Sequence, residues 1–233
     1  MRKGIIIAID GPAASGKSTI AKSVALAFGY VYIDTGAMYR AITLKALRGG
    51  ISLSDKQAMT KLAENTLLRF TYETVGSTSQ MYLWMDKTDV TDPIRSQEVT
   101  QNVSEVAAIP GVRAALVKAQ QAMGSEGGVV MDGRDIGTVV FPDAELKIFL
   151  SASVEERTRR RLLELQEKGT AIDFEELRQQ IITRDHYDSH READPLRQAE
   201  DAYFLDTTSL SIDEVTAKVI ELAIGRGGKV KTV

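Results

Sequence analysis

The sequence contains no cysteine among its 233 residues. Disulfide bonds and thiolate metal sites are therefore excluded, which agrees with a reducing cytosol. A basic excess is also missing, because the formal net charge is -3, and this argues against a nucleic-acid partner. The apolar run that follows Arg2 and Lys3 is cut by Asp10 and is too short for a secretory signal or a membrane span. We therefore expect a cytoplasmic protein that binds neither nucleic acid nor membrane.

The length and composition are those of a soluble globular protein. Hydrophobic residues make up 43% of the sequence and charged residues 26%, and both values are ordinary. A chain of this length can bury one sizeable core. We therefore expect residues 1–233 to form a single domain with insertions, and we expect a monomer.

Short apolar segments alternate with helix-like segments along the chain. Five apolar segments are expected to form strands, at residues 4–9, 31–33, 129–131, 147–150 and 203–205. Helix-like segments at 16–28 and 37–47 follow the first two of them. Strands and helices that alternate in this way predict an α/β fold in which helices flank a parallel β-sheet.

Two stretches interrupt this alternation. Residues 68–74 and 80–86 have the pattern of a hairpin across 75–79, which predicts a small antiparallel insertion around 66–90. The second stretch, 153–191, is expected to be helical. In it Ser153 and Glu156 have the spacing of a capping box, Gly169 can end that helix, and Asp173 can cap another.

A phosphate-binding motif of the form G-x-x-x-x-G-K-[ST] follows the first predicted strand. It consists of Gly11, Pro12, Ala13, Ala14, Ser15, Gly16, Lys17 and Ser18. Small residues let backbone N–H groups surround phosphate oxygens, and the next helix points its positive end at the same anion. The lysine of such a loop supplies charge to the β- and γ-phosphates, while the final hydroxyl can bind Mg²⁺. A strand before the motif and a helix after it are the context that this motif requires.

A carboxylate is needed beside this loop to hold the metal or its water molecules. Asp132 follows the predicted strand 129–131 and is the better candidate. Asp34, at the end of the second predicted strand, is the rival, although either residue could instead cap the next helix.

The phosphate-binding loop alone indicates binding of a nucleoside triphosphate and leaves three classes open. These are a kinase for a small molecule or nucleotide, a GTPase-like switch and a nucleic-acid motor. A switch normally carries an N-K-x-D motif, which this sequence lacks. A motor usually needs a longer chain and a basic surface, so the kinase is favoured.

Arginine residues strengthen the kinase interpretation, because guanidinium groups suit phosphates and neutralise the transferring group. Those near strand ends or in the second interrupting stretch are Arg40, Arg134, Arg157, Arg160, Arg161, Arg184 and Arg191. Arg159 is expected to be a solvated surface charge.

The segment after Asp173 carries an apolar stripe that becomes charged at the same helical spacing. Its members are Phe174, Leu177 and Ile181, and then Arg184, Asp188 and Arg191. Such a face can leave the core and enter a binding site, or it can form a surface ion-pair face. His186 and His190 have the spacing of a metal pair, but no third ligand is evident, so we expect them to face solvent.

Four segments together resemble the bacterial cytidylate kinase family. They are IDGPAASGKST at 9–19, DTGAMYR at 34–40, DGRDIGTVVFPD at 132–143, and residues 184–191. The resemblance implies the fold of P-loop nucleoside monophosphate kinases, with a monophosphate-binding region at 35–115 and a helical lid at 153–190. It implies ATP with Mg²⁺ as the donor and CMP and dCMP as acceptors. The alternatives to this function are a kinase for another small acceptor, such as UMP or a metabolite hydroxyl, and a P-loop nucleotide switch.

The resemblance also assigns roles to individual residues. It assigns ATP binding to residues 11–18 of the phosphate-binding loop, to Thr19, and to the lid arginines Arg157 and Arg161. The acceptor nucleotide is assigned to Thr35, Arg40, Ser104, Arg113, Arg134, Asp135, Arg184, Asp188 and Arg191. Within this set Arg40 and Arg134 hold the phosphate, and Ser104, Arg113 and Asp135 surround the cytosine. The residues expected to stabilise the transferring group are Lys17, Arg134, Arg161 and Arg184. Thr35 stands where the family often has serine, so the hydroxyl is kept.

Overall fold

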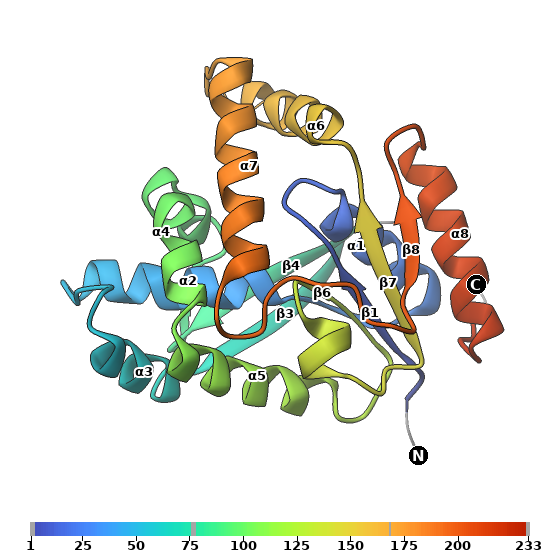
Figure 1. Cartoon of the computed structure of the whole chain (residues 1–233). Coiled ribbons are helices and arrows are strands. Elements are labelled where there is room, and N and C mark those ends of the chain that lie inside the picture. Colours follow the sequence, from blue (N-terminus) through green and yellow to red (C-terminus); the bar gives the residue numbers. More distant parts are fainter. Residues whose placement is uncertain (1–2, 76–77, 168, 232–233) are drawn as a thin grey trace. The chain divides into compact units, whose positions relative to one another are not determined.

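The computed structural model describes residues 3–75, 78–167 and 169–231. Its main sheet has five parallel strands in the order β2-β6-β1-β7-β8 (Figure 1). The strands are β1 (Ile6–Asp10), β2 (Val31–Asp34), β6 (Val129–Gly133), β7 (Leu146–Ser151) and β8 (Tyr203–Asp206). All five strands predicted from the sequence are present, and the predicted α/β fold is confirmed.

β1 is the central strand of this sheet, and every one of its residues is buried. A continuously apolar strand fits this position because both of its faces are covered. Its register pairs Ile9 with Asp132 of β6 and Asp10 with Gly133. The carboxyl ends of β1 and β6 therefore lie side by side, at the edge of a parallel sheet where ligands bind.

α1 (Lys17–Phe28) starts directly after the phosphate-binding motif. Gly29 ends it in a left-handed conformation, with its N–H bonded to the carbonyls of the last turn. α1 packs against β1, β6 and α8 (Ile212–Gly225). α8 begins with a complete capping box made by Ser211 and Glu214, which gives the C-terminal helix a defined start against the sheet.

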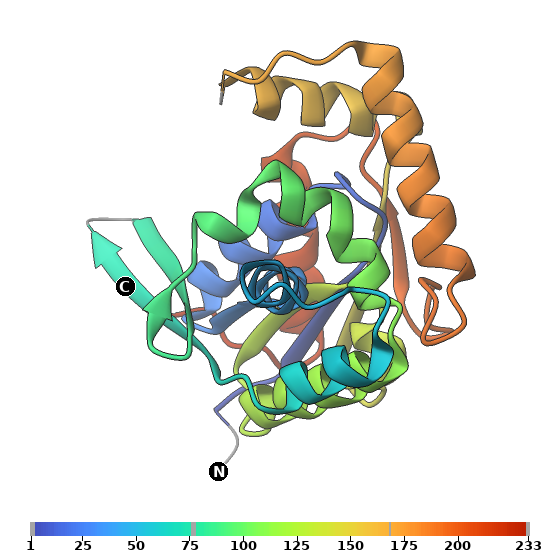
Figure 2. The ribbon, with the colours of Figure 1, turned by 90° about the vertical axis from the view of Figure 1, so that its left-hand side faces the viewer.

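α6 (Val154–Glu167) and α7 (Phe174–His190) form the predicted helical stretch, and they pack against each other. Ser153 Oγ accepts from the Glu156 N–H at 3.2 Å, and Asp173 accepts from Glu175 and Glu176. The Asp173 cap is therefore confirmed. Ser153 caps α6 as predicted, but the capping box is not completed, because the Ser153 N–H donates to Thr208 Oγ1 at 2.9 Å and the Glu156 carboxylate binds Arg159 and Arg160. Figure 2 shows α7 as a long helix whose first turns lie beside α6.

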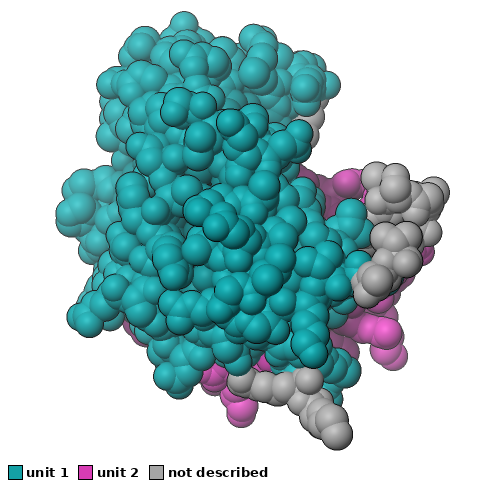
Figure 3. All heavy atoms as spheres, turned by 90° about the vertical axis from the view of Figure 1, so that its right-hand side faces the viewer, with its two compact units in different colours: residues 1–32, 126–233 teal, residues 33–125 magenta. Residues whose placement is uncertain are grey.

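Two compact units make up the chain, residues 1–32 with 126–233 and residues 33–125, coloured separately in Figure 3. The second unit contains the predicted hairpin: β3 (Leu68–Val75) pairs antiparallel with β4 (Thr78–Met85), and β5 (Thr88–Asp89) joins them. Two residues of the predicted turn, Gly76 and Ser77, lie outside the described residues.

Helices bury most of the core of this second unit. They are α2 (Thr35–Arg48), α3 (Lys56–Glu64), the short η1 (Pro93–Arg95), α4 (Gln97–Ala107) and α5 (Pro110–Gly124). α2 packs against α4, and α3 packs against α5, around a core that includes Met38, Ile42 and Leu116. The predicted boundaries at 35–115 and 153–190 concern function and stay predictions. Of the described helices, none has both the length and the apolar character needed to cross a membrane.

Candidate active site

The phosphate-binding loop between β1 and α1 adopts a conformation that its small residues permit. At Gly11 a Cβ atom would lie 1.9 Å from the Leu150 carbonyl oxygen, and the φ angle is +149°. Gly16 has φ +88°, and Ala14 is left-handed with φ +58° although it is not glycine. A non-glycine residue in this region carries strain that the surroundings must offset. The loop is therefore built for close approach of backbone N–H groups to an anion.

Lys17 begins α1, and its ammonium group is buried against the same loop. Its Nζ atom donates to the Pro12 carbonyl oxygen at 2.6 Å and to Ser15 Oγ at 3.2 Å. Burial, reinforced by the positive charge of Arg134, lowers the pKa of Lys17 to about 7. A bound polyphosphate would supply negative charge and oppose this shift, so the ammonium group gains from binding of a nucleotide.

Ser18 and Asp132 meet beside the loop. Ser18 Oγ donates to Asp132 Oδ2 at 2.9 Å, and Tyr32 donates to Asp132 Oδ1 at 2.8 Å. A hydroxyl and a buried carboxylate fit Mg²⁺, which usually takes one or two protein ligands together with phosphate oxygens and water. The described residues hold no cluster of three or more acidic, histidine or cysteine ligands. Asp34, the rival carboxylate, instead caps α2 by accepting from the Ala37 N–H at 2.9 Å.

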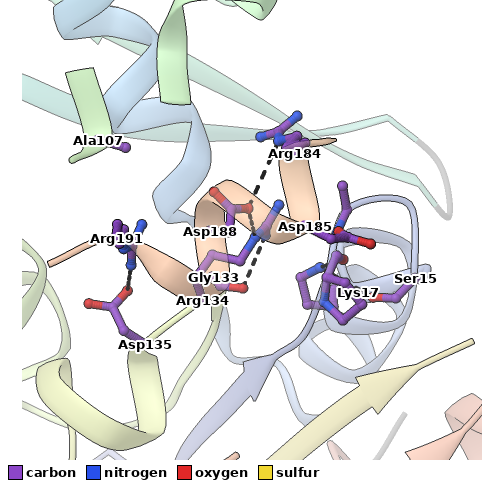
Figure 4. Close-up of polar contacts among 12 residues, drawn as sticks. Ser15, Lys17, Ala107, Gly133, Arg134, Asp135, Arg184, Asp185, Asp188 and Arg191 are labelled. Carbon is purple, nitrogen blue, oxygen red and sulfur yellow. Dashed lines mark hydrogen bonds and ion pairs between the residues drawn. The ribbon is translucent and has the colours of Figure 1, made fainter. Parts of the chain in front are cut away.

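Arg134 and Arg184 lie on either side of Asp188 (Figure 4). Arg134 Nε donates to Asp188 Oδ2 at 2.8 Å, whereas Arg184 Nε lies 4.0 Å from the same oxygen. Arg184 Nε is buried and has no hydrogen-bond partner among the described residues. Burial, together with the positive charge of Arg134, lowers the pKa of Arg184 to about 10. The single carboxylate of Asp188 thus lies between two guanidinium groups, and it cannot accept from all of their N–H groups. N–H donors of Arg184 are therefore left for a bound anion.

The charged face of α7 is therefore not a solvated ion-pair face. Leu177 and Ile181 are buried as predicted, and Asp188 is almost wholly buried as well. His186 and His190 are exposed as expected, and their rings stack with centroids 4.0 Å apart. Along α7, the buried apolar positions Leu177 and Ile181 are thus followed by the buried carboxylate of Asp188, which binds Arg134.

Arg191 and Asp135 form a second buried pair, with Nη2 and Oδ1 3.8 Å apart. Arg191 also donates to the Asp194 carbonyl oxygen from Nε at 2.9 Å and from Nη2 at 2.5 Å. Asp135 therefore lies beside Arg191, which is 56 positions away along the chain. This placement matters for the role that the sequence assigns to Asp135.

The arginines of α6 differ in their surroundings. Arg157 is buried and bonded on several sides, whereas Arg161 is half-buried and pairs with Glu164 at 2.6 Å. Arg160 donates to the Thr207 carbonyl oxygen at 2.6 Å. Arg159 is 64% exposed and pairs with Glu156, so its expected place on the surface is confirmed.

Four predicted acceptor residues lie in the second unit. Thr35 is buried in the first turn of α2. Arg40 donates to Thr100 Oγ1 at 2.8 Å. Arg113 is 2% exposed, donates to the Ala107 carbonyl oxygen at 3.1 Å and lies 5.5 Å from the ring centre of Tyr39. Ser104 is half-buried on α4. None of these observations tests contact with a nucleotide, so the four assignments stay predictions.

Asp10 is a buried polar residue of this region that the sequence reasoning gave no role. Its Oδ1 and Oδ2 atoms accept from the N–H groups of Ile136 and Gly137 at 2.8 and 2.7 Å. These residues start η2 (Ile136–Val140), a π-helical turn directly after Arg134 and Asp135. The carboxylate thus ties the end of β1 to the segment that carries both site residues. Its position directly before the glycine-rich loop was the only signal in the sequence.

Asp10 should make stability depend on pH. Burial raises the pKa of Asp10 to about 7, although the two N–H groups oppose the shift. Between the ordinary value and 7, the folded protein keeps a proton that the unfolded chain has released, so stability falls as the pH rises. The free energy of unfolding of the wild type, relative to Asp10→Asn, should fall by about 2 kcal/mol from pH 5 to pH 7. Urea unfolding of both proteins at pH 5 and pH 7 measures this difference in the free energy of unfolding. If the difference is the same at both pH values, the two N–H groups fully offset the effect of burial on the pKa of Asp10.

A buried ammonium and an incompletely bonded guanidinium beside a phosphate-binding loop can neutralise a phosphoryl group in transfer. Together with the five-stranded parallel sheet, they define the class of P-loop kinases. Comparison with known proteins gives the family. The sequence model of the cytidylate kinase family matches residues 7–224. The chain belongs to the cytidylate kinase family, and it is a nucleoside monophosphate kinase.

Similar proteins support this membership. A cytidylate kinase of Bacillus pumilus (strain SAFR-032) is 53% identical over 223 residues, which cover 96% of this chain and 97% of the relative. A cytidylate kinase of Listeria innocua is 54% identical over 223 residues, with the same two shares. Among solved structures, an uncharacterized protein from Eubacterium ventriosum is similar with a TM-score of 0.51 at 12% identity, over 94% of this chain and 98% of that one. That likeness concerns the fold alone.

Proposed function

We propose that this kinase transfers the γ-phosphoryl group of ATP to CMP and dCMP, giving ADP with CDP or dCDP. The observation that supports it best is the group of Lys17, Arg134 and Arg184 beside the phosphate-binding loop, with the Arg184 Nε atom buried and unbonded among the described residues. Lys17 is buried and the two arginines are half-buried, so three cations lie close together, and a triphosphate would supply negative charge to all of them. Membership of the cytidylate kinase family supports the choice of acceptor. The protein is proposed to act in the cytoplasm as a monomer.

On the donor side, the loop N–H groups and Lys17 bind the phosphates of ATP. Thr19, in the first turn of α1, completes the contacts of the loop, and Arg157 and Arg161 belong to the ATP site from α6. Mg²⁺ would be held by Ser18 and Asp132, whose side chains already meet. When bound, the metal ion supplies positive charge to the phosphate oxygens and helps to orient them.

On the acceptor side, Arg40 and Arg134 are proposed to bind the phosphate of the monophosphate. Thr35 binds the same nucleotide through its hydroxyl. Ser104 and Arg113 take part in recognition of cytosine. These assignments are supported by the match between the motifs of this chain and those of the family.

The remaining acceptor residues are proposed to be Asp135, Arg184, Asp188 and Arg191. The last three lie on or directly after α7, and they reach the ribose and the phosphates in this proposal. Asp188 fixes the direction of Arg134 through the 2.8 Å bond to its Nε atom.

The chemistry needs positioning and charge neutralisation more than proton transfer. A phosphate oxygen of CMP attacks the γ-phosphorus in line with the bond to the β-phosphate of ATP. No general base is required because the acceptor phosphate is already largely ionised at neutral pH. Lys17, Arg134, Arg161 and Arg184 stabilise the charge on the transferring group. Exclusion of water from the site prevents hydrolysis of ATP.

Release of ADP from ATP, measured against a panel of acceptors, tests the proposal. We expect fast release with CMP and dCMP and slow release with UMP, small hydroxy acids or no acceptor. Fast release with a different acceptor would assign another substrate, and slow hydrolysis that no acceptor accelerates would indicate a nucleotide switch.

Asp135 provides the sharpest test of base recognition. A carboxylate can accept from the amine of cytosine but repels the oxygen that uracil presents at that position, and an unpaired buried group costs about 1–3 kcal/mol. We therefore expect Asp135→Ala to lower kcat/KM for CMP by about 10- to 100-fold and to shrink the CMP/UMP ratio. Steady-state kinetics with both acceptors measures this.

The pairing of Asp135 with Arg191 defines the competing outcome. If Asp135 only orients Arg191, activity with CMP and UMP falls by the same factor and the ratio holds, which removes Asp135 from base recognition. Asp143→Ala serves as the matched control, because that aspartate follows the same segment but is exposed. It should change neither kcat/KM nor the ratio.

A further inference from the structure

The peptide groups of Ala13, in the phosphate-binding loop, are held by one ion pair. Asp185 Oδ1, on α7, accepts from the Ala13 N–H at 3.3 Å. Arg157 Nη1, on α6, donates to the Ala13 carbonyl oxygen at 3.1 Å. The two side chains also bond to each other, with Nη1 and Asp185 Oδ2 2.5 Å apart. Both hydrogen-bonding groups of one loop residue are thus bound by a single pair. Figure 4 shows Asp185 on α7 beside the loop that carries Ser15 and Lys17.

Arg157 is itself held rigidly. Only 5% of its side chain is exposed, and its Nε atom donates to the Ala152 carbonyl oxygen at 3.0 Å, at the end of β7. A planar guanidinium that bonds to Ala152, Ala13 and Asp185 together has a fixed position. It differs in this from Arg161 on the same helix, which is half-buried and whose ion pair is with Glu164 of its own helix.

The loop needs such support at this residue. Ala14, directly after Ala13, is in the left-handed region with φ +58°, a conformation that persists only where its surroundings maintain it. The orientation of the Ala13–Ala14 peptide sets the direction of the following loop N–H groups, which bind phosphate in such motifs.

The charges of the pair also matter. A carboxylate at a loop that binds phosphates would repel the ligand if it stood alone. Arg157 neutralises Asp185, so the pair can hold the loop without adding net charge to the site. Removing the arginine alone leaves an unpaired carboxylate at the Ala13 N–H, whereas removing both charges does not.

We propose that Asp185 and Arg157 are positioning residues that hold the Ala13 peptide, and thereby the phosphate-binding loop, in the conformation that binds the nucleotide. This inference rests on the proposed function and gives Arg157 a role through the loop. Asp185 is assigned no role by the sequence motifs, because its partners lie 172 and 28 positions away along the chain.

Binding of ADP with Mg²⁺, measured by calorimetry without CMP, tests the inference on Arg157→Met, Asp185→Asn and the double variant. Arg157→Met should weaken ADP binding by about 30-fold or more, because the loop loses a bond and gains an unpaired negative charge. Asp185→Asn, which leaves the arginine in place, should weaken it by about 3- to 10-fold. The double variant should bind ADP at least about 3-fold more tightly than Arg157→Met. KM for CMP should stay within about twofold of the wild type in each variant.

Two results would overturn the inference. Equal ADP affinity of the double variant and Arg157→Met would mean that Arg157 contacts the nucleotide directly, and tighter binding by Asp185→Asn would mean that Asp185 competes with the nucleotide. If thermal melting shows that Arg157→Met is not folded, two other variants replace it and the double variant. They are Arg157→Lys and Arg157→Lys combined with Asp185→Asn, and the same order of ADP affinities is expected. A wild type that binds ADP but does not phosphorylate CMP would overturn the proposed function and leave this inference standing.

A second ion pair between the same helices gives the matched control. Arg178 on α7 lies 3.5 Å from Glu155 on α6, and Glu155 is 59% exposed. The variant Arg178→Met with Glu155→Gln removes a contact between α6 and α7 without touching the loop. Its affinity for ADP should equal that of the wild type, and a loss as large as that of Arg157→Met would mean that α6–α7 packing, rather than the loop, controls binding.

Discussion

Replacing Lys17 with methionine should reduce the rate of phosphoryl transfer by roughly 100-fold or more while the protein stays folded. Such a loss corresponds to about 2.7 kcal/mol of transition-state stabilisation. The expectation follows from the position of Nζ, which is bound to Pro12 and Ser15 inside the phosphate-binding loop. Methionine keeps most of the side-chain volume, so the packing around the start of α1 should survive.

Stability should change little in this variant. The variant lacks the hydrogen bond to the Pro12 carbonyl oxygen. It also lacks a cation that is costly to bury, because burial lowers the pKa of Lys17 to about 7. A group that is costly to keep charged in the folded state contributes little net stability when it is charged. Single-turnover kinetics with ATP and CMP, together with thermal melting, separates the two effects.

Lys22→Met is the control for Lys17→Met, because Lys22 lies on the same helix with its side chain exposed. It should leave the rate and the melting temperature unchanged. A folded Lys17→Met protein with nearly normal turnover would remove Lys17 from the catalytic role and, with it, the reading of the loop as the donor site.

The sequence predicted those parts of the site that depend on neighbours along the chain. The spacing from Gly11 to Ser18, between an apolar strand and a helix, identified the loop, and the structure has β1 and α1 on either side of it. The pairing of Ser18 with Asp132 was also predictable, because the loop that leads to Ser18 and the end of β6 that carries Asp132 both lie at the carboxyl ends of neighbouring parallel strands, which meet at one edge of the sheet.

Contacts between distant segments could not be predicted in the same way. The strand order β2-β6-β1-β7-β8 depends on which sheet edge each helix crosses, and no local pattern encodes that choice. Asp10 was invisible as a functional residue because its partners, Ile136 and Gly137, lie 126 and 127 positions away. The contact between Asp135 and Arg191 was equally out of reach of local patterns, because the two residues lie 56 positions apart.

Replacing Arg184 with methionine should have the second large effect, a loss of about 100-fold in kcat/KM without a loss of stability. Arg184 has the features of a group kept for a ligand. Its Nε atom is buried without a hydrogen-bond partner among the described residues, and it lies 4.0 Å from Asp188, whose Oδ2 atom already accepts from Arg134. A buried donor without an acceptor destabilises the free protein, and a bound anion removes this cost by accepting the hydrogen bond.

The stability of Arg184→Met should therefore equal or exceed that of the wild type. Burial and the positive charge of Arg134 lower the pKa of Arg184 to about 10, so the folded state disfavours this cation. Asp188→Ala is a less clean test, because it leaves the guanidinium of Arg134 without its carboxylate and should lower stability and activity together. Thermal melting and steady-state kinetics of the two variants, measured side by side, show whether activity and stability separate at Arg184 but not at Asp188.

Arg178→Met supplies the matched control for the Arg184 experiment. Arg178 lies on the same helix, its side chain is 34% exposed against 30% for Arg184, and its ion pairs are with Glu155 and Glu175. If both arginines only form surface ion pairs on α7, the two variants should have similar kcat/KM and similar melting temperatures, since exposed ion pairs contribute about 0–1 kcal/mol. A large loss of kcat/KM confined to Arg184→Met, with the melting temperature maintained, places this guanidinium on the transferring phosphate. Equal and small effects in the two variants would make the charged end of α7 a structural feature and leave the neutralisation of the phosphate to Lys17 and Arg134.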